Sequence, residues 1–269
     1  MPRYDFRTPR LYVDHPLAAG VKLVLDGGQV NYLRNVLRLR PGDPVLAFNG
    51  QDGEWHAAVA DGGKRALGLA IEALSRAQTP ALDLHYWFAP LKHARLDYMV
   101  QKAVEMGVSR LQPVLTQHGQ VARLNLERMR ANAIEAAQQC GILTLPDIAA
   151  PLRLERVIAE RDPARFLVFC DEDVEVKDPI AALAVARQEA GPGPLSGLGP
   201  LSGSGPMRLA VLVGPEGGFA DAERATLLRL PNVARLALGP RILRADTAAV
   251  AALALVQTVL GDWRTPLIP

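Results

Sequence analysis

The sequence is poor in cysteine and in aromatic residues. Its 269 residues include only two cysteines, Cys140 and Cys170, and the aromatic share is 5%. Two cysteines cannot build a disulfide framework or a cysteine-based zinc site. The five histidines show no metal-ligand spacing, so we expect no bound metal. We expect both thiols to be buried structural groups, since free cysteines behave mostly as small apolar side chains.

Long apolar runs and signal-like segments are also lacking. No apolar run approaches the roughly 20 residues that a membrane-spanning helix needs. The first residues, MPRYDFRTPRLYV, lack the apolar core of a secretory signal. We therefore expect a cytoplasmic protein that has no membrane partner.

The chain has no strong excess of charge of either sign. Its 30 Lys and Arg residues nearly balance 28 Asp and Glu residues, which leaves a net charge of +2. This balance does not indicate nucleic-acid binding, so only local clusters of charge could do so. The motifs G-x-G-x-x-G and G-x-x-x-x-G-K-[ST] are absent as well. Their absence argues against a dinucleotide or a nucleoside triphosphate as the ligand.

The length and the order of the expected elements indicate two domains. Residues 1–76 favour a small, mostly β domain, and residues 77–269 an α/β domain with a sizeable core. A strand, a helix and a second strand follow one another over residues 82–114, an order typical of a parallel sheet. The segment 191–206, GPGPLSGLGPLSGSGP, cannot bury enough apolar surface to fold, so we interpret it as a flexible insertion.

Two short apolar runs near the carboxyl end each lead into a loop rich in glycine. Residues 209–213 precede GPEGG, and residues 233–238 precede Gly239 and Pro240. Loops after neighbouring parallel strands meet at one edge of the sheet, where ligands commonly bind. The acidic segment 171–173 follows another expected strand, so it would be either a third wall of that cleft or a solvated loop. Each glycine-rich segment alone could also be a simple turn.

A long apolar helix is expected at residues 247–260, directly after the second loop. The segment before it reads Arg241-Ile-Leu-Arg244-Ala-Asp246. Asp246 or Thr247 would cap this helix, because a short side-chain oxygen can accept an unpaired amide hydrogen. The helix is apolar on nearly every side, so we expect it to be buried.

The two loops, GPEGGF and LGPRILRADTA, closely resemble the signature of the SPOUT methyltransferases, specifically the ribosomal RNA small-subunit methyltransferase E family. That resemblance implies a catalytic α/β domain with a mostly parallel sheet and a C-terminal trefoil knot. It also implies methylation of N3 of one uridine in 16S rRNA with S-adenosyl-L-methionine as donor. The expected partners are the small ribosomal subunit and a second copy of the chain.

The resemblance assigns residues to the donor and to catalysis. The donor site would comprise residues of both loops and their flanks: Leu212, Gly214, Pro215, Glu216, Gly217, Gly218, Leu238, Gly239, Ile242, Leu243 and Thr247. Uracil N3 must lose its proton before it attacks, and a cation near the carbonyl oxygens would stabilise the resulting anion. Arg244 is our first choice for that cation and Arg241 our second. Asp246 would orient one of them or cap the helix, and Glu216 is a candidate base or donor-orienting group.

The first domain resembles the PUA-like β-barrel domain of the same family. Its segment VLRLRPGD, residues 36–43, matches the family core, and residues 29–39 have helical spacing. Arg34 and Arg38 are four apart, so we expect them to share a helix face. The residues expected to contact RNA are basic and lie in or near matching motifs: Arg10, Arg34, Arg38, Arg40 and Lys92. A solvated surface with scattered arginines is the alternative.

Several positions depart from the family pattern. Asn31 and Tyr32 stand where histidines are usual, and His118 and Ile142 where arginines are usual. Lys102 and Glu105 match a family motif, and an ion pair within their helix would also explain them. The alternatives are a related enzyme acting on another RNA position and an RNA-binding assembly factor without catalysis. A small-molecule α/β enzyme would not need the arginine-rich first domain.

Overall fold

The computed structural model describes residues 7–62, 66–121, 123–174, 178–189 and 207–263. The chain forms two compact units. The first comprises residues up to 80 together with 137–145, and the second comprises 81–136 and the rest from 146. Compared with the predicted boundary at 76, the first unit extends four residues further and takes in a segment from much later in the chain. The predicted insertion at 191–206 lies outside the described residues.

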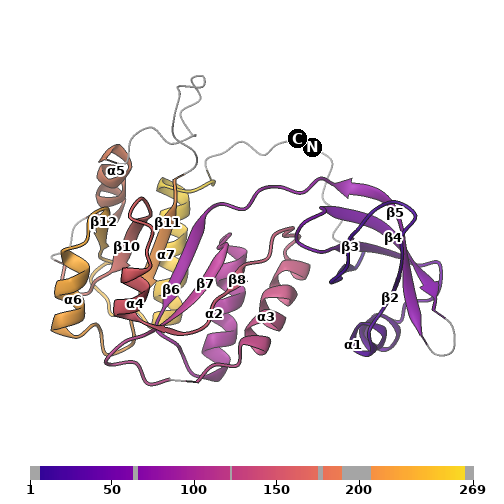
Figure 1. The fold of residues 1–269 in the computed structure, drawn as a ribbon, viewed down its shortest axis with the longest axis horizontal. Helices are drawn as coiled ribbons and strands as arrows, with labels where there is room; N and C mark the ends of the chain where they lie inside the picture. Colours follow the sequence, from indigo (N-terminus) through magenta and orange to yellow (C-terminus); the bar gives the residue numbers. More distant parts are fainter. Residues whose placement is uncertain (1–6, 63–65, 122, 175–177, 190–206, 264–269) are drawn as a thin grey trace. The chain divides into compact units, whose positions relative to one another are not determined.

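The first unit contains a curled five-stranded sheet (Figure 1). The strands, in spatial order, are β1 (Arg10–Tyr12), β3 (Pro44–Phe48), β4 (Glu54–Asp61), β5 (Leu67–Arg76) and β2 (Lys22–Val24). β1 pairs with β3 in parallel, and the other neighbours are antiparallel. The apolar side chains of the curled sheet enclose a core that includes Leu33, Val45 and Leu69. The architecture is consistent with the expected PUA-like domain.

A short helix follows β2 in the first unit. α1 (Gly27–Asn31) is capped by the Asp26 side chain and continues into the π-helical turn η1 (Tyr32–Val36). The backbone then turns to the left-handed region at Arg38, where φ is +58°. Arg34 and Arg38 therefore do not share a helix face, and that prediction is wrong because the helix ends before the second arginine.

The second unit is built on a parallel sheet, as predicted. Its spatial order is β12-β10-β11-β6-β7-β8, with β9 pairing the far end of β7, and every one of these pairings is parallel. The strands are β6 (Leu84–Phe88), β7 (Arg110–Leu115), β8 (Asp147–Ile148), β9 (Leu152–Arg153), β10 (Phe166–Cys170), β11 (Leu209–Val213) and β12 (Val233–Leu236). Because all these strands run the same way, the loops after them meet at one edge of the sheet.

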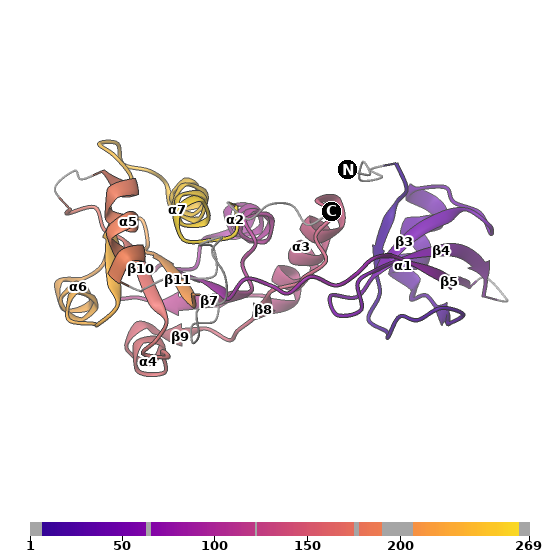
Figure 2. The same ribbon diagram turned by 90° about the horizontal axis from the view of Figure 1, so that it is seen from above.

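Helices cover both faces of this sheet. They are α2 (His93–Glu105), α3 (Leu126–Gln139), α4 (Leu154–Ala159), α5 (Pro179–Glu189), α6 (Asp221–Leu228) and α7 (Ala245–Val259). Figure 2 shows α2, α5 and α7 on one side and α4 and α6 on the other. Successive strand residues point to opposite faces: Trp87 packs in a core with Leu154 and Leu227, whereas the Tyr86 hydroxyl reaches Met99 of α2. In α2, Lys102 and Glu105 form the expected ion pair.

The last helix, α7, is buried along much of its length, as predicted. Its Gln257 is fully buried and donates a hydrogen bond to the carbonyl of Met106 at 2.6 Å. The helix begins at Ala245, so Asp246 and Thr247 lie within its first turn and cannot cap it; Arg244 holds the N-cap position without a side-chain hydrogen bond. The predicted cap is therefore wrong. No helix in the described ranges is long and apolar enough to cross a membrane.

The two cysteines differ in environment. Cys170 is half-buried beside the first hollow, and desolvation together with the Asp171 charge raises the pKa of its thiol to about 12. Cys140, just after the end of α3, is exposed. The expectation that both thiols are buried is therefore wrong for Cys140.

Candidate functional site

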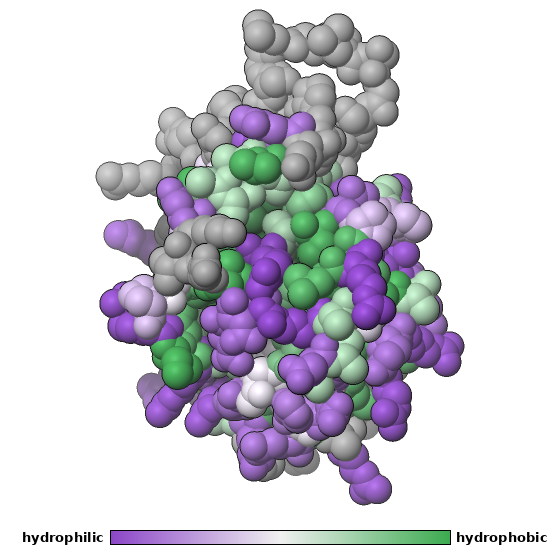
Figure 3. Space-filling view, turned by 90° about the vertical axis from the view of Figure 1, so that its left-hand side faces the viewer, coloured by the Kyte–Doolittle hydropathy of each residue, from purple (hydrophilic) through white to green (hydrophobic). Residues whose placement is uncertain are grey.

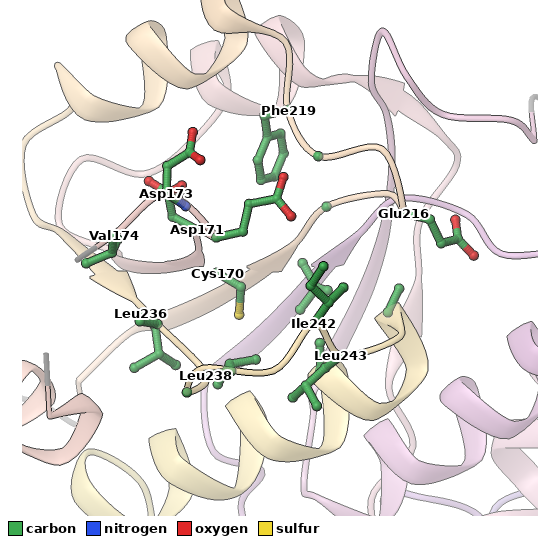
Figure 4. A pocket seen from close by; sticks show the side chains of 18 of the residues that line it. Cys170, Asp171, Asp173, Val174, Glu216, Phe219, Leu236, Leu238, Ile242 and Leu243 are labelled. Atoms are coloured by element: carbon green, nitrogen blue, oxygen red, sulfur yellow. Dashed lines mark hydrogen bonds between the residues drawn. The ribbon is translucent and has the colours of Figure 1, made fainter. Parts of the chain in front are cut away.

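A hollow of ≈ 330 Å³ lies at the carboxyl ends of β10, β11 and β12, beside the start of α7 (Figure 4). We call it the first hollow. Its walls come from three loops: residues 171–174 after β10, residues 214–219 after β11, and residues 237–243 after β12. Both glycine-rich loops and the acidic segment therefore meet at one edge of the parallel sheet.

Most residues that the sequence assigned to this site line the first hollow. They are Gly214, Pro215, Glu216, Gly218, Leu238, Gly239, Arg241, Ile242 and Leu243. The described lining does not include Leu212, Gly217, Arg244 or Thr247. Leu212 is fully buried in the core beneath α4 and α6. Arg244 is exposed immediately before α7, and Thr247 is exposed within its first turn.

The floor of the first hollow is apolar. Figure 4 shows the side chains of Leu236, Leu238 and Cys170 around it, with Leu243 and Ile242 towards α7. Leu236 is nearly buried, whereas Ile242 is 97% exposed at the rim. Gly239 has a φ of +89°, and no heavy atom lies within 4 Å of the place where a Cβ would be. A flat, partly apolar ligand can therefore approach the backbone of this loop closely.

The acidic loop forms the opposite wall. Asp171 is 5% exposed and accepts hydrogen bonds from Arg224 and Arg235, at 3.2 Å and 2.8 Å from the Nε atoms. Arg224 also pairs with Asp173 at 3.1 Å. The sequence suggested this loop as a possible wall but gave no signal for its two arginines, which come from α6 and β12.

Glu172 of the acidic wall lies close to the glycine loop, residues 214–218. A Cβ on Gly218 would lie 2.4 Å from Glu172 Oε1, and the φ of Gly218 is +69°. The exposed Glu172 side chain could move aside, so it is the backbone conformation that favours glycine at this position. Glu172 and Asp173 are exposed beside the first hollow, so their negative charge favours a cationic ligand.

Two side chains hold the glycine loop from outside. Arg95 Nη1 of α2 lies 3.0 Å from Glu216 Oε1, and both side chains are partly exposed. Figure 4 shows Glu216 apart from the side chains that surround the first hollow. His118 Nδ1 lies 3.1 Å from the carbonyl oxygen of Gly217. A carbonyl can only accept, so Nδ1 carries the proton. The sequence predicted neither contact, although His118 stands where the family usually has an arginine.

The basic residues predicted to contact RNA do not share one environment. Arg34, Arg38 and Arg40 are exposed in the first unit, and Lys92 is exposed before α2 in the second. Arg10 is instead 7% exposed. Its Nε lies 2.6 Å from Glu54, and it donates further hydrogen bonds to carbonyls of residues 137, 138 and 142. All these contacts lie within the first unit. We therefore replace the predicted RNA-binding role of Arg10 with an internal, structural one.

Metal ligands do not gather in the described residues. No group of three or more His, Cys, Asp or Glu side chains there has an arrangement that could hold a metal ion.

The chain is similar to RNA methyltransferases over nearly its whole length. Residues 78–257 match the RNA methyltransferase domain, and residues 25–72 match the RNA methyltransferase PUA domain. Ribosomal RNA small subunit methyltransferase E of Rickettsia conorii is 28% identical over 94% of this chain and 96% of its own length. The enzyme of the same name from Synechocystis is 29% identical over 88% of this chain and 73% of its own length.

Solved structures agree with the sequence comparison. The crystal structure of ribosomal RNA small subunit methyltransferase E from Neisseria gonorrhoeae, bound to S-adenosyl methionine, has a TM-score of 0.77 and 25% identity and covers 96% of this chain and 100% of that chain. A methyltransferase structure from Legionella pneumophila with bound SAM has a TM-score of 0.73 and 25% identity over 94% of this chain and 98% of that chain. The domain match covers more than half of the sequence, and the chain therefore belongs to the family of RNA methyltransferases.

Proposed function

We propose that this protein transfers the methyl group of S-adenosylmethionine to N3 of a uridine in the 16S rRNA of the small ribosomal subunit. The observation that carries the proposal is the meeting of the two glycine-rich loops around the first hollow. Relatives that carry the name of ribosomal RNA small subunit methyltransferase E align with nearly all of this chain, and one of them was crystallised with S-adenosyl methionine.

The residues around the first hollow fit this donor. Leu236, Leu238 and Leu243 offer apolar surface for the adenine ring, and the open backbone at Gly239 offers hydrogen-bonding groups beside it. Glu172 and Asp173 place negative charge near a ligand that is cationic at sulfur and at its amino group. When bound, S-adenosylmethionine supplies an electrophilic methyl group on a sulfonium centre.

Arg244 is our choice for the cation that stabilises the uracil anion. Removal of the N3 proton leaves negative charge on the two neighbouring carbonyl oxygens, which a fixed cation stabilises in a site that excludes water. Arg244 holds the N-cap position of α7, where the positive end of the helix dipole adds to its charge. Arg241 lines the first hollow and is the second choice.

Glu216 is better suited to positioning than to proton removal. Its carboxylate is paired with Arg95, and this pair holds the glycine loop against α2. A general base needs a free carboxylate within hydrogen-bond reach of the proton. We therefore propose that Glu216 orients the loop around the donor and that the N3 proton leaves to water.

The decisive experiment separates methyl transfer from donor binding. Arg244→Ala should lower single-turnover methylation of unmodified small subunits by about 100-fold while the Kd for S-adenosylmethionine stays within about twofold. Arg241→Ala is the matched variant in the same loop and should have the smaller effect on transfer. An equal loss of binding and transfer in Arg244→Ala would assign Arg244 to the donor instead.

The target is tested separately, by mass mapping of 16S rRNA from cells that lack the gene. Loss of methylation at N3 of one uridine is the expected result. Persistence of every modified uridine would refute the proposed substrate. A wild-type protein that binds no S-adenosylmethionine would instead be the RNA-binding assembly factor without catalysis.

RNA phosphates are the expected partners of the remaining exposed cations. Arg34, Arg38 and Arg40 lie in the first unit, where residues 25–72 match the PUA domain of RNA methyltransferases. Arginine suits phosphate because its planar fork makes two hydrogen bonds at once. We propose that these three side chains bind the RNA backbone, that Lys92 does so in the second unit, and that Arg10 does not.

We also propose a C-terminal trefoil knot, a cytoplasmic location and a homodimer. Exposed apolar side chains in the second unit support the homodimer. Ile242 is 97% exposed, and Ile180 and Val185 of α5 are each about half exposed. Figure 3 shows apolar residues gathered on the side of the second unit where α5 and β12 lie. A second copy of the chain would cover such a surface. Light scattering should give the mass of a dimer, and a monomer at micromolar concentration would contradict this part of the proposal.

A further inference from the structure

A second hollow, of ≈ 660 Å³, lies in the second unit. Its walls are the segment 115–121 after β7, the start of α4 and the first turns of α6. None of its lining residues lines the first hollow. Its volume falls within the range of about 300–1,000 Å³ that is typical of ligand sites.

A buried carboxylate connects the walls of the second hollow to the glycine loop. Glu223 of α6 is 7% exposed, and its two oxygens accept hydrogen bonds from the backbone amides of Gln117 and Ala220, at 2.8 Å and 3.0 Å. The next residue along the first of these segments, His118, donates to the carbonyl of Gly217. The segment after β7 therefore contacts the glycine loop on one side and borders the second hollow on the other.

The lining combines an apolar floor with polar groups at the rim. Pro90, Leu115 and Leu154 are among the apolar residues, and the amides of Gln117 and Gln120 lie with the Glu155 carboxylate among the exposed polar ones. An unstacked nucleobase needs such surroundings, since it offers flat apolar faces and an edge of hydrogen-bonding groups.

One polar atom in this lining has no partner. Thr116 Oγ1 is buried and makes no hydrogen bond within the described structure. An unsatisfied buried hydroxyl costs about 1–3 kcal/mol, so such groups are usually satisfied by a ligand or by water. Thr116 is a lining residue of the second hollow, so a change of its side-chain rotamer would present this hydroxyl to a ligand there.

We propose that the second hollow binds a nucleobase of the substrate RNA next to the target uridine. The inference rests on the proposed function, because it assigns the first hollow to the donor and to the target base. The Glu155 carboxylate is an acceptor, so it favours a base edge that presents hydrogen-bond donors, such as an exocyclic amino group. Arg153, at the same rim, is placed to bind the phosphate of that nucleotide.

The experiment fills the second hollow. Ala222 is an exposed lining residue in the first turn of α6, so Ala222→Trp should occupy the space without disturbing the core. Leu228→Trp is the matched control, because Leu228 is 45% exposed at the end of the same helix and outside the lining. Both variants and the wild type are titrated with unmodified 16S rRNA and, separately, with S-adenosylmethionine.

Ala222→Trp should weaken RNA binding about tenfold, which corresponds to ~1.4 kcal/mol, and leave the donor Kd within about twofold. Leu228→Trp should change neither constant. Unchanged RNA binding in Ala222→Trp, or equal weakening in both variants, would overturn the inference. If Ala222→Trp does not fold, Gln120→Ala removes a rim amide at an exposed position, and an unchanged RNA Kd in that variant would overturn the inference as well.

Failure of the base site and failure of the proposed chemistry give different results. If Ala222→Trp binds RNA more weakly than the wild type does, but the wild type methylates no uridine N3, the proposed function fails and the base site stands. If the wild type methylates N3 and Ala222→Trp binds RNA normally, the base site fails and the proposed function stands.

Discussion

Each unit contains a buried carboxylate that is held by two arginines, and the two centres are used differently. The Glu54 side chain in the first unit is 1% exposed between Arg10 and Arg76. The Asp171 side chain in the second unit is 4% exposed, between Arg224 and Arg235. Both centres pair one carboxylate with two arginines, so the difference lies in what else the arginines contact.

In the first unit the arginines bind backbone. Arg10 donates to carbonyls of residues 137, 138 and 142, and Arg76 donates to the carbonyl of Gly141 at 2.8 Å. Burial alone would raise the pKa of Glu54, but the hydrogen bonds and charges of Arg76 and Arg10 outweigh it and lower that pKa. The centre therefore fixes the late segment 137–145 onto the curled sheet.

In the second unit one of the two arginines faces the first hollow. Arg224 and Asp171 both line the first hollow, and Arg224 also pairs with the exposed Asp173. The same kind of ion pair thus stabilises the fold in the first unit, where backbone carbonyls surround its arginines. In the second unit it forms a wall of the first hollow, because one of its sides faces that space. Substitutions at the two carboxylates should therefore have different readouts.

The largest effect should come from Glu54→Gln. It leaves the Arg10 guanidinium buried without a countercharge, which costs about 3 kcal/mol of unfolding free energy. Urea unfolding monitored by circular dichroism measures this loss. Glu72→Gln, at an exposed position of β5, is the control and should change stability little. A Glu54→Gln protein as stable as the control would show that this centre does not hold the first unit together.

A smaller, more local effect is expected for Asp171→Asn. The substitution keeps the volume but removes the charge that positions Arg224 and Arg235, so the Kd for S-adenosylmethionine should rise about tenfold, or ~1.4 kcal/mol. Isothermal titration calorimetry measures this change. Asp221→Asn, in the exposed first turn of α6, should leave the Kd unchanged. If donor affinity survives in Asp171→Asn and only stability falls, the contrast between the two centres disappears.

The elements that the sequence predicted well are those with strong local signals. β11 spans Leu209–Val213, as the run of apolar residues indicated, and the loops that follow β11 and β12 meet as parallel-strand geometry requires. The helices α4 and α6 were missed because they are only six and eight residues long. So short a segment gives too few turns for helical periodicity to stand out.

The errors at individual residues have a common physical cause. Arg10 was predicted to be a surface cation because its partners at residues 137 and 142 lie 127 and 132 positions away along the chain. The arginines of the Asp171 centre and the His118 contact with Gly217 were unpredicted for the same reason. Composition and spacing describe neighbours in sequence, whereas the burial of a charge depends on groups that only the fold brings together.

A half-buried histidine tests whether charges of the second unit that lie away from the first hollow affect stability alone. His85, in β6 near the amino-terminal edge of the sheet, has its pKa lowered from 6.5 to about 4, first by burial and then by the Arg165 charge, while Asp83 opposes the shift. Arg110 and Asp147 also act on this imidazole: the Arg110 charge lowers its pKa further, and the Asp147 charge raises it.

The pH dependence follows from that direction. Between pH 6.5 and about 4 the unfolded chain binds a proton at His85 that the folded chain does not. The contribution of His85 to stability should therefore be nearly complete at pH 7 and fall as the pH is lowered, by about 1 kcal/mol between pH 7 and pH 5.5. Urea unfolding of the wild type and of His85→Gln at both pH values isolates this contribution, since the variant should lose that part of the slope. The donor Kd of His85→Gln at pH 7 should equal that of the wild type. A slope that persists in the variant would assign the acid sensitivity to other groups, and a changed Kd would show that the amino-terminal edge of the sheet is coupled to the first hollow.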